Sequence, residues 1–124
     1  MTGAEKPSAK VLAERARAKG AFPHLLDGDV TVDKPSTMDA IAQALSFPAY
    51  FGRNLDALYD CLTDLSWLPP GEHVLIWVNS DNLKQAEPRT YQSIRSVLSD
   101  AQLALAPGGD RADERHLAVL LADS

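Results

Sequence analysis

The chain has 124 residues, of which 45% are hydrophobic and 23% are charged. This is the composition of an ordinary soluble globular protein, and the length suits one domain with its own core. The formal net charge is −5, but the first 20 residues carry five cations against two anions, which leaves seven cations and fifteen anions for the rest. Because so acidic a body repels nucleic acid and attracts basic proteins, we expect no nucleic-acid partner.

Cysteine usage and hydropathy indicate the compartment. Cys61 is the single cysteine, which excludes an internal disulfide framework and favours a reducing cytoplasm. No apolar run approaches the length of a membrane span, and the N-terminus lacks the apolar segment of a secretory signal. We therefore expect a cytoplasmic protein with no membrane contact.

The first 20 residues form a weak pattern. Residues 1–7 are predicted to be disordered, and Ser8 can cap a short helix that ends at Gly20. The apolar stripe of that helix is thin: Val11, Leu12 and Ala16. We interpret residues 1–20 as an N-terminal extension, weakly helical or disordered, and residues 21–124 as the domain proper.

The domain begins with a strand and a helix. Residues 22–26 predict a short strand with Pro23 at its start, and residues 27–29 predict a turn. A helix is expected over residues 38–45, capped by Ser36 or Thr37 and ended before Pro48. Helical spacing predicts that four of its side chains are buried: Met38, Ile41, Ala42 and Leu45.

The stretch from Ala49 to Trp67 predicts a loop that turns at Gly52 and a helix that Asn54 caps. One face of this helix is apolar, with Leu55, Leu58, Cys61, Leu62 and Leu65. The opposite face carries Asp56, Asp60, Thr63 and Asp64, and no Lys or Arg occurs from residue 54 to residue 68. Four aromatic residues lie in or beside it: Tyr50, Phe51, Tyr59 and Trp67.

Aligned aspartates destabilise a helix. Each like-charged pair one turn apart costs roughly 0.2–0.5 kcal/mol, and Asp has a mediocre helix propensity. One interpretation is an ordinary solvated face that happens to be acidic. The missing cations and the aromatic neighbours favour the other interpretation, a surface that binds a cationic partner.

Two further strands and a long helix complete the chain. Residues 69–71 break the chain, and residues 73–78 form a continuous apolar run typical of a central strand covered on both faces. A short helical turn is expected after residues 79–82, and a longer helix after Pro88. Its predicted buried stripe is Tyr91, Ile94, Val97, Leu98, Ala101 and Leu105. Residues 107–109 should stop that helix, and residues 116–121 predict the last strand.

The order strand, two helices, strand, helix, strand determines the fold class. Each connection is long enough for a right-handed parallel crossover. The sequence therefore predicts an α/β fold: a small sandwich on a three-stranded parallel sheet flanked by helices.

Catalytic chemistry finds little support. His24, His73 and His116 lack metal-ligand spacing, and Gly108-Gly109-Asp110 lacks the Lys and the Ser or Thr of a phosphate loop. The helical aspartates could hold Mg²⁺ or act as acid and base, but a stripe on one helix points its carboxylates outward in parallel. We expect no enzyme, no metal site and no cofactor; a metal-dependent enzyme stays the least favoured hypothesis.

The segment Tyr50-Phe51-Gly52-Arg53-Asn54-Leu55-Asp56-Ala57-Leu58-Tyr59-Asp60-Cys61-Leu62-Thr63 resembles the signature of the barstar family of ribonuclease inhibitors. The similarity extends back to residues 37–48 and forward to Trp67 and residues 74–78, and it covers roughly residues 22–121. The resemblance implies a small α/β fold on a three-stranded parallel sheet. It also implies a bacterial immunity protein, or antitoxin, that plugs the active site of a basic, secreted, barnase-type ribonuclease inside the producing cell.

The resemblance implies a protein partner, the basic ribonuclease or nuclease toxin, for a chain that is monomeric when free. With the acidic helix it predicts a partner-binding surface of nine residues: Tyr50, Asn54, Asp56, Tyr59, Asp60, Thr63, Asp64, Trp67 and Asp100. Asp60 falls where the family places the carboxylate that enters the phosphate pocket. Two residues depart from the family pattern: Arg53 puts a cation at the rim of this acidic surface, and Tyr59 stands at a position that can be Trp. Both favour a partner other than the best-known ribonuclease, or weaker binding to it. The alternative is a regulatory module whose basic partner is not a nuclease.

Overall fold

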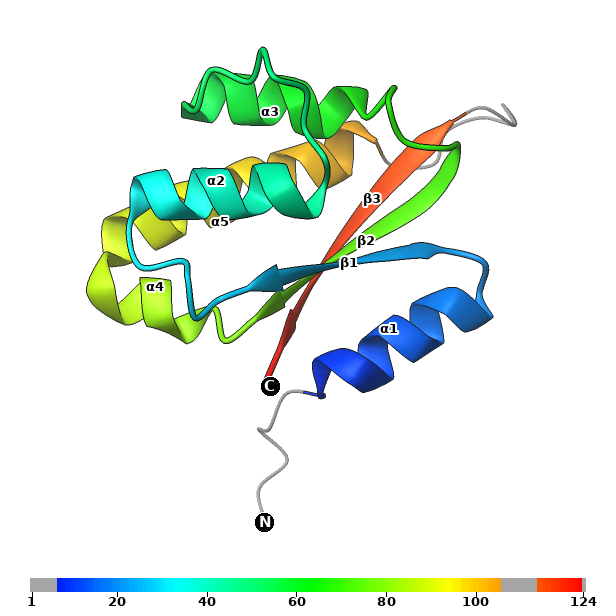
Figure 1. Cartoon of the computed structure of the whole chain (residues 1–124), viewed down its shortest axis with the longest axis horizontal. Coiled ribbons are helices and arrows are strands. Elements are labelled where there is room, and N and C mark those ends of the chain that lie inside the picture. The colour runs from blue at the N-terminus through cyan, green and yellow to red at the C-terminus, as the bar shows by residue number, and fades with distance from the viewer. Residues whose placement is uncertain (1–6, 106–113, 124) are drawn as a thin grey trace.

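A computed structural model describes residues 7–105 and 114–123 of the chain (Figure 1). Its elements are, in order, α1 (Ala9–Ala18), β1 (Phe22–Asp27), α2 (Lys34–Ala44), α3 (Leu55–Asp64), β2 (Gly71–Val78), α4 (Asp81–Ala86), α5 (Pro88–Ala104) and β3 (Arg115–Ala122). The strands form one parallel sheet in the order β1-β2-β3. The predicted α/β fold with a three-stranded parallel sheet is confirmed. The expected helix stop at residues 107–109 lies outside the described residues.

The sheet is covered on both faces because its central strand is apolar from Val74 to Val78. β2 pairs with β1 on one edge and with β3 on the other, so Leu75 lies between His24 and Val119. Leu75 and Trp77 are fully buried on the face that α2, α3 and α5 cover, whereas Ile76 faces α1 on the other side (Figure 1). This pattern confirms the prediction that the apolar run at residues 73–78 is the central strand.

α2 begins earlier than the sequence predicted. The cap is Asp33 rather than Ser36 or Thr37: its carboxylate accepts from the Ser36 N–H at 2.9 Å, and the Ser36 hydroxyl accepts from the Asp33 N–H at 3.1 Å. This reciprocal capping box admits Pro35 in the first turn, where no N–H is needed. The expected start at residue 38 was therefore wrong by one helical turn.

Most of the predicted core is buried, with one exception on α2. Met38, Ile41 and Leu45 are fully buried, but Ala42 is only half-buried, and Ala40 and Ala44 pack against the core instead. On α5 the buried residues are Tyr91, Ile94, Leu98 and Ala101, and Val97 and Leu105 pack against the same cluster while half-exposed. The short helical segment expected after β2 is α4.

α1 packs on the back face of the sheet, the face opposite α2, α3 and α5 (Figure 1). Ser8 caps it as predicted, by accepting from the Val11 N–H at 3.3 Å. The buried stripe differs from the expected one, because Ala13 is buried beside Leu12 and Ala16, whereas Val11 is 38% exposed. The separation of residues 1–20 as an extension stays a prediction.

On this side the segment at Pro7–Ala9 pairs with Asp123. The Ala9 N–H donates to the Asp123 carbonyl, and the Asp123 N–H donates to the Pro7 carbonyl, both at 3.2 Å. The first turn of α1 is thus tied to the end of β3. Within residues 7–105 and 114–123, no helix combines the length and the apolar composition needed to cross a membrane.

Two histidines join β1 to β2 at the start of the sheet. The His73 ring is fully buried, and its Nε2 lies 2.8 Å from the Pro69 carbonyl, which can only accept. His73 Nε2 therefore carries the hydrogen, and its Nδ1 can accept from His24 Nε2 at 2.9 Å. Burial lowers the pKa of His24, the neighbouring His73 lowers it further, and the Ala44 carbonyl opposes both.

We expect Leu12→Ala to lower the free energy of unfolding by about 2 kcal/mol or more, because it leaves a cavity between α1 and the sheet. Val11→Ala, the adjacent and exposed position, should change it by about 0.5 kcal/mol or less. Urea denaturation of both variants and the wild type measures the difference. Equal effects at the two positions would contradict the packing of α1.

A pH dependence follows from His24. Its pKa in the folded protein lies below the ordinary value of 6.5, so the unfolded chain binds more protons near and below that pH. The free energy of unfolding should therefore fall as the pH is lowered from about 7.5 to about 5. His24→Gln keeps a donor for His73 and removes the titration, so its decrease should be smaller, as urea denaturation at both pH values will show. An identical decrease in the variant would exclude His24 as the cause.

Candidate functional site

α3 separates an apolar face from an acidic one. Leu58, Cys61 and Leu62 are buried under the helix, and Leu65 is buried just after it, as the spacing predicted. Leu55 is half-buried at the first turn. Burial raises the pKa of the Cys61 thiol, and the nearby Asp64 and Asp60 carboxylates raise it further. Cys61 is consequently an inert core residue rather than a nucleophile.

Three exposed carboxylates follow one another along the outer face of α3. Asp56, Asp60 and Asp64 are all exposed, one turn apart, and we call them the acidic stripe. Among the described residues neither Asp56 nor Asp60 makes an ion pair, and Asp64 accepts only a hydrogen bond from the Ser66 hydroxyl at 3.2 Å. The stripe therefore presents its charge to solvent.

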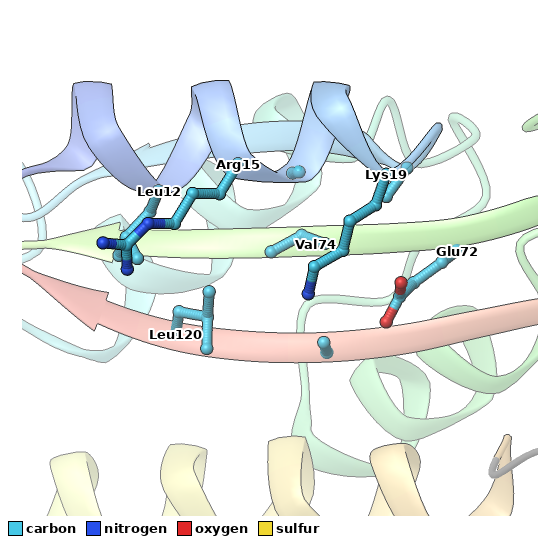
Figure 2. A pocket seen from close by; sticks show the side chains of 9 residues that line it. Leu12, Arg15, Lys19, Glu72, Val74 and Leu120 are labelled. Carbon is cyan, nitrogen blue, oxygen red and sulfur yellow. The ribbon is translucent and has the colours of Figure 1, made fainter.

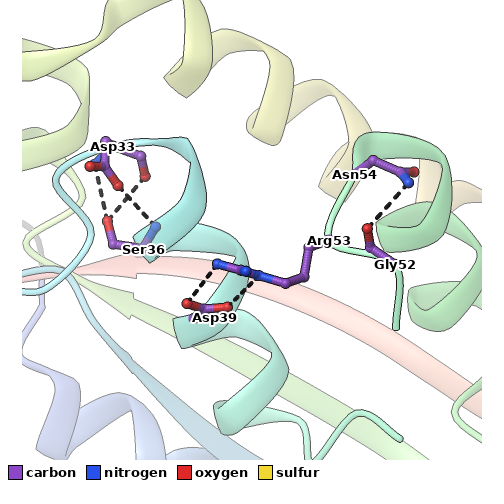
Figure 3. Close-up of polar contacts among 6 residues, drawn as sticks. All are labelled: Asp33, Ser36, Asp39, Gly52, Arg53 and Asn54. Carbon is purple, nitrogen blue, oxygen red and sulfur yellow. Dashed lines mark hydrogen bonds and ion pairs between the residues drawn. The ribbon is translucent and has the colours of Figure 1, made fainter. Parts of the chain in front are cut away.

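The loop before α3 is fixed to α2 by an ion pair. Arg53 adopts a left-handed backbone conformation (φ 54°), and its guanidinium contacts both carboxylate oxygens of Asp39, at 2.8 and 2.9 Å (Figure 3). Asn54 then caps α3 by accepting from the Ala57 N–H at 2.8 Å. The positive charge of Arg53 is thus balanced by Asp39 and does not stand alone at the edge of the acidic stripe.

The loop after α3 is fixed by contacts of three residues, one in the loop and two on neighbouring strands. Trp67 Nε1 donates to the Leu45 carbonyl at 2.9 Å, and the Arg115 guanidinium from β3 donates twice to the Leu68 carbonyl, at 2.8 and 3.0 Å. His73 on β2 contacts the next carbonyl, that of Pro69. Both flanking loops are thus held by other elements, and α3 itself packs against α5.

The aromatic residues of the stretch divide into exposed and structural ones. Tyr50 is 73% exposed and Tyr59 is 37% exposed, so both rings are accessible beside the acidic stripe. Trp67 is half-buried and meets Phe47 edge-on with ring centroids 5.8 Å apart. Trp67 therefore stabilises the loop, and only its exposed part can contribute to a binding surface.

The remaining predicted site residues differ in their surroundings. The Thr63 hydroxyl donates to the Tyr59 carbonyl at 2.8 Å, which satisfies it inside the helix. Asp100 is exposed on α5, the helix that packs beside α3. The nine-residue binding surface as a whole stays a prediction.

Sequence reasoning missed the residues that hold the site in place. No sequence motif marks Asp39, Arg115 or His73. Each depends on a contact with a residue far along the chain, 14 positions away for Asp39, 47 for Arg115 and 49 for His73. It also missed a hollow of about 130 Å³ at the first turn of α3, lined by Lys34, Leu55, Arg89, Thr90, Ser93 and Ile94. The left-handed position of Arg53, a non-glycine residue at a turn, has no sequence signal.

In the described part of the chain no three His, Cys, Asp or Glu residues are grouped as metal ligands.

The fold and this surface define a class of protein: a small α/β domain that presents an acidic helix on a three-stranded parallel sheet. The chain belongs to the family "Barstar (barnase inhibitor)", whose family model matches residues 21–122. It is also similar to the Bacillus subtilis (strain 168) protein named "Putative ribonuclease inhibitor YrdF", with 58% identity over 31 residues. That match spans 25% of this chain and 34% of the relative.

The cap of α3 can be tested directly. Asn54→Ala should lower the free energy of unfolding by about 1 kcal/mol, because the Ala57 N–H loses its acceptor. Asn54→Asp supplies the same acceptor and should stay close to wild type. Thermal or urea denaturation compares the three proteins, and an Asp variant as unstable as the Ala variant would argue against capping.

Proposed function

We propose that this protein is an inhibitor of a basic, barnase-type ribonuclease, whose active site it plugs with the acidic stripe and the loop before α3. The observation that carries the proposal is the exposed pair of carboxylates Asp56 and Asp60, which make no ion pair among the described residues, on a helix whose two flanking loops are held by other elements. Membership of the barstar family supports the same function. The name of the Bacillus relative agrees with it.

The physical basis is mimicry of a phosphodiester. A ribonuclease active site uses cationic side chains to bind its anionic substrate, and a carboxylate can accept the same charge-assisted hydrogen bonds. The anchors at Asp39 and Leu45 hold α3 before the partner arrives. Little conformational entropy is then lost on binding, which favours affinity.

Asp60 is the proposed centre of the surface, because it lies in the middle of the acidic stripe with an equal charge one turn away on each side. Tyr50 and Tyr59 would supply exposed aromatic area, which is enriched at interface hot spots. Asn54, Thr63 and Trp67 would form the surrounding rim, and Asp100 a second acidic contact.

The proposed setting is the cytoplasm of the cell that secretes the ribonuclease, with the inhibitor as a monomer that forms a one-to-one complex. The acidic balance of residues 21–124 would steer a basic enzyme toward this surface. Because Asp39 balances Arg53, the cation in the binding loop is compatible with a basic partner.

Asp60→Ala should weaken binding to a barnase-type ribonuclease by about 2 kcal/mol or more, the threshold for a hot-spot residue; the barnase–barstar complex is itself the reference case for such losses. Calorimetric titration and an RNA-cleavage assay measure binding and inhibition.

The matched control is Glu14→Ala, which removes one exposed carboxylate from α1 on the opposite face of the sheet. It should leave inhibition nearly unchanged. Equal inhibition by the wild type and the Asp60 variant would overturn the role of Asp60. A wild type that binds no ribonuclease, but captures another basic protein, would favour a regulatory module instead.

A further inference from the structure

α1 leaves part of the back face of the sheet uncovered, and the result is an open groove beside β3 (Figure 2). Its volume is about 240 Å³. The floor and walls are mostly apolar side chains from α1, β2, β3 and the turn before β1: Leu12, Ala16, Ala21, Val74, Ala118 and Leu120. The groove exists because three of these residues are alanines, and Leu120 is accordingly 38% exposed.

Among the polar residues that line the groove, two are cations and one is an anion. Arg15 and Lys19 project from α1 over the apolar floor, and Glu72 lies at the Lys19 end (Figure 2). Within residues 7–105 and 114–123, neither Arg15 nor Lys19 forms an ion pair. Lys19 faces the carboxylate of Glu72, whereas Arg15, at the opposite end near Leu120, faces no anion in the groove. An apolar groove with an unbalanced cation at one end is complementary to an amphipathic anion.

We propose that this groove binds a medium-chain fatty acid. Its carboxylate would accept hydrogen bonds from the Arg15 guanidinium, and its alkyl chain would lie on Leu12, Val74 and Ala118. Glu72 repels a carboxylate and so sets the orientation, with the head group at Arg15. Ligand pockets are commonly apolar with a few polar groups that fix orientation, and a volume below about 300 Å³ suits a small ligand.

A peptide fits this groove less well for two reasons. β2 already uses its backbone groups on both edges, in pairing with β1 and with β3. An extended peptide lying across the face of the sheet would therefore leave its own N–H and C=O groups without backbone partners. A helical peptide, about 10 Å wide, exceeds a hollow of this volume. An alkyl chain has no such polar groups to satisfy.

The proposal does not depend on ribonuclease inhibition, since the groove and α3 lie on opposite faces of the sheet. The full chain is titrated with sodium decanoate below its micelle concentration, by calorimetry, and with decyltrimethylammonium as the probe of opposite charge. We expect decanoate to bind and decyltrimethylammonium not to bind. Arg15→Gln should weaken decanoate binding by about tenfold, the value of one hydrogen bond to a charged group.

The matched control is Arg17→Gln, an exposed cation of the same helix outside the groove. It should bind decanoate as the wild type does. Ala118→Leu fills the groove without touching a charge and should abolish binding while the protein stays folded by circular dichroism. The proposal is overturned if decanoate fails to bind, if both Arg variants lose affinity equally, if decyltrimethylammonium binds as tightly, or if only an acidic apolar peptide binds.

Discussion

Burial of β2 on two faces and two edges is the constraint on which the rest of the structure depends. Ile76 is enclosed by α1, and its neighbours Leu75 and Trp77 are enclosed by the helices of the other face. A strand with one polar side would have left that face in water, so packing of helices on both faces requires this apolar run. Leu58 and Leu62 of α3 belong to the same cluster as Trp77, and α3 packs against α5, so the position of the acidic stripe depends on this core as well.

The start of β2 also controls the end of α3. His73 is held by His24 on one side and contacts the Pro69 carbonyl on the other, so strand pairing and loop position are coupled through one buried ring. Arg115 provides a second link between the sheet and the same loop. The buried ring of His73 reaches both partners only when the strands and the loop lie as they do here. Any other placement of the loop would leave buried polar groups without hydrogen bonds, which costs free energy. This coupling explains how a helix weakened by its own aspartates is kept in place.

Charge is distributed between two faces of the sheet. α1 carries cations such as Arg15 and Arg17 on the back face, and α3 carries its aspartates on the front. A molecule with this polarity orients itself in the field of a charged partner and approaches a basic one with α3 leading. The balanced pair of Arg53 and Asp39 leaves that polarity intact, although the sequence alone suggested a positive defect in the acidic surface.

The sequence by itself determined the fold class, the buried faces of α3 and α5 and the acidic stripe, because these follow from local periodicity and from residue type. It did not determine where α2 begins. The helix is capped by the carboxylate of Asp33, whereas the sequence offered the hydroxyls of Ser36 and Thr37 as caps. Nor did it determine the partners of Arg53, Trp67 and His73, which lie 14, 22 and 49 positions away. Such contacts depend on how elements meet in space, and only the tertiary structure decided them. The groove beside β3 is of the same kind, since it results from small side chains of α1, the turn before β1 and β3 that come together only in the folded chain.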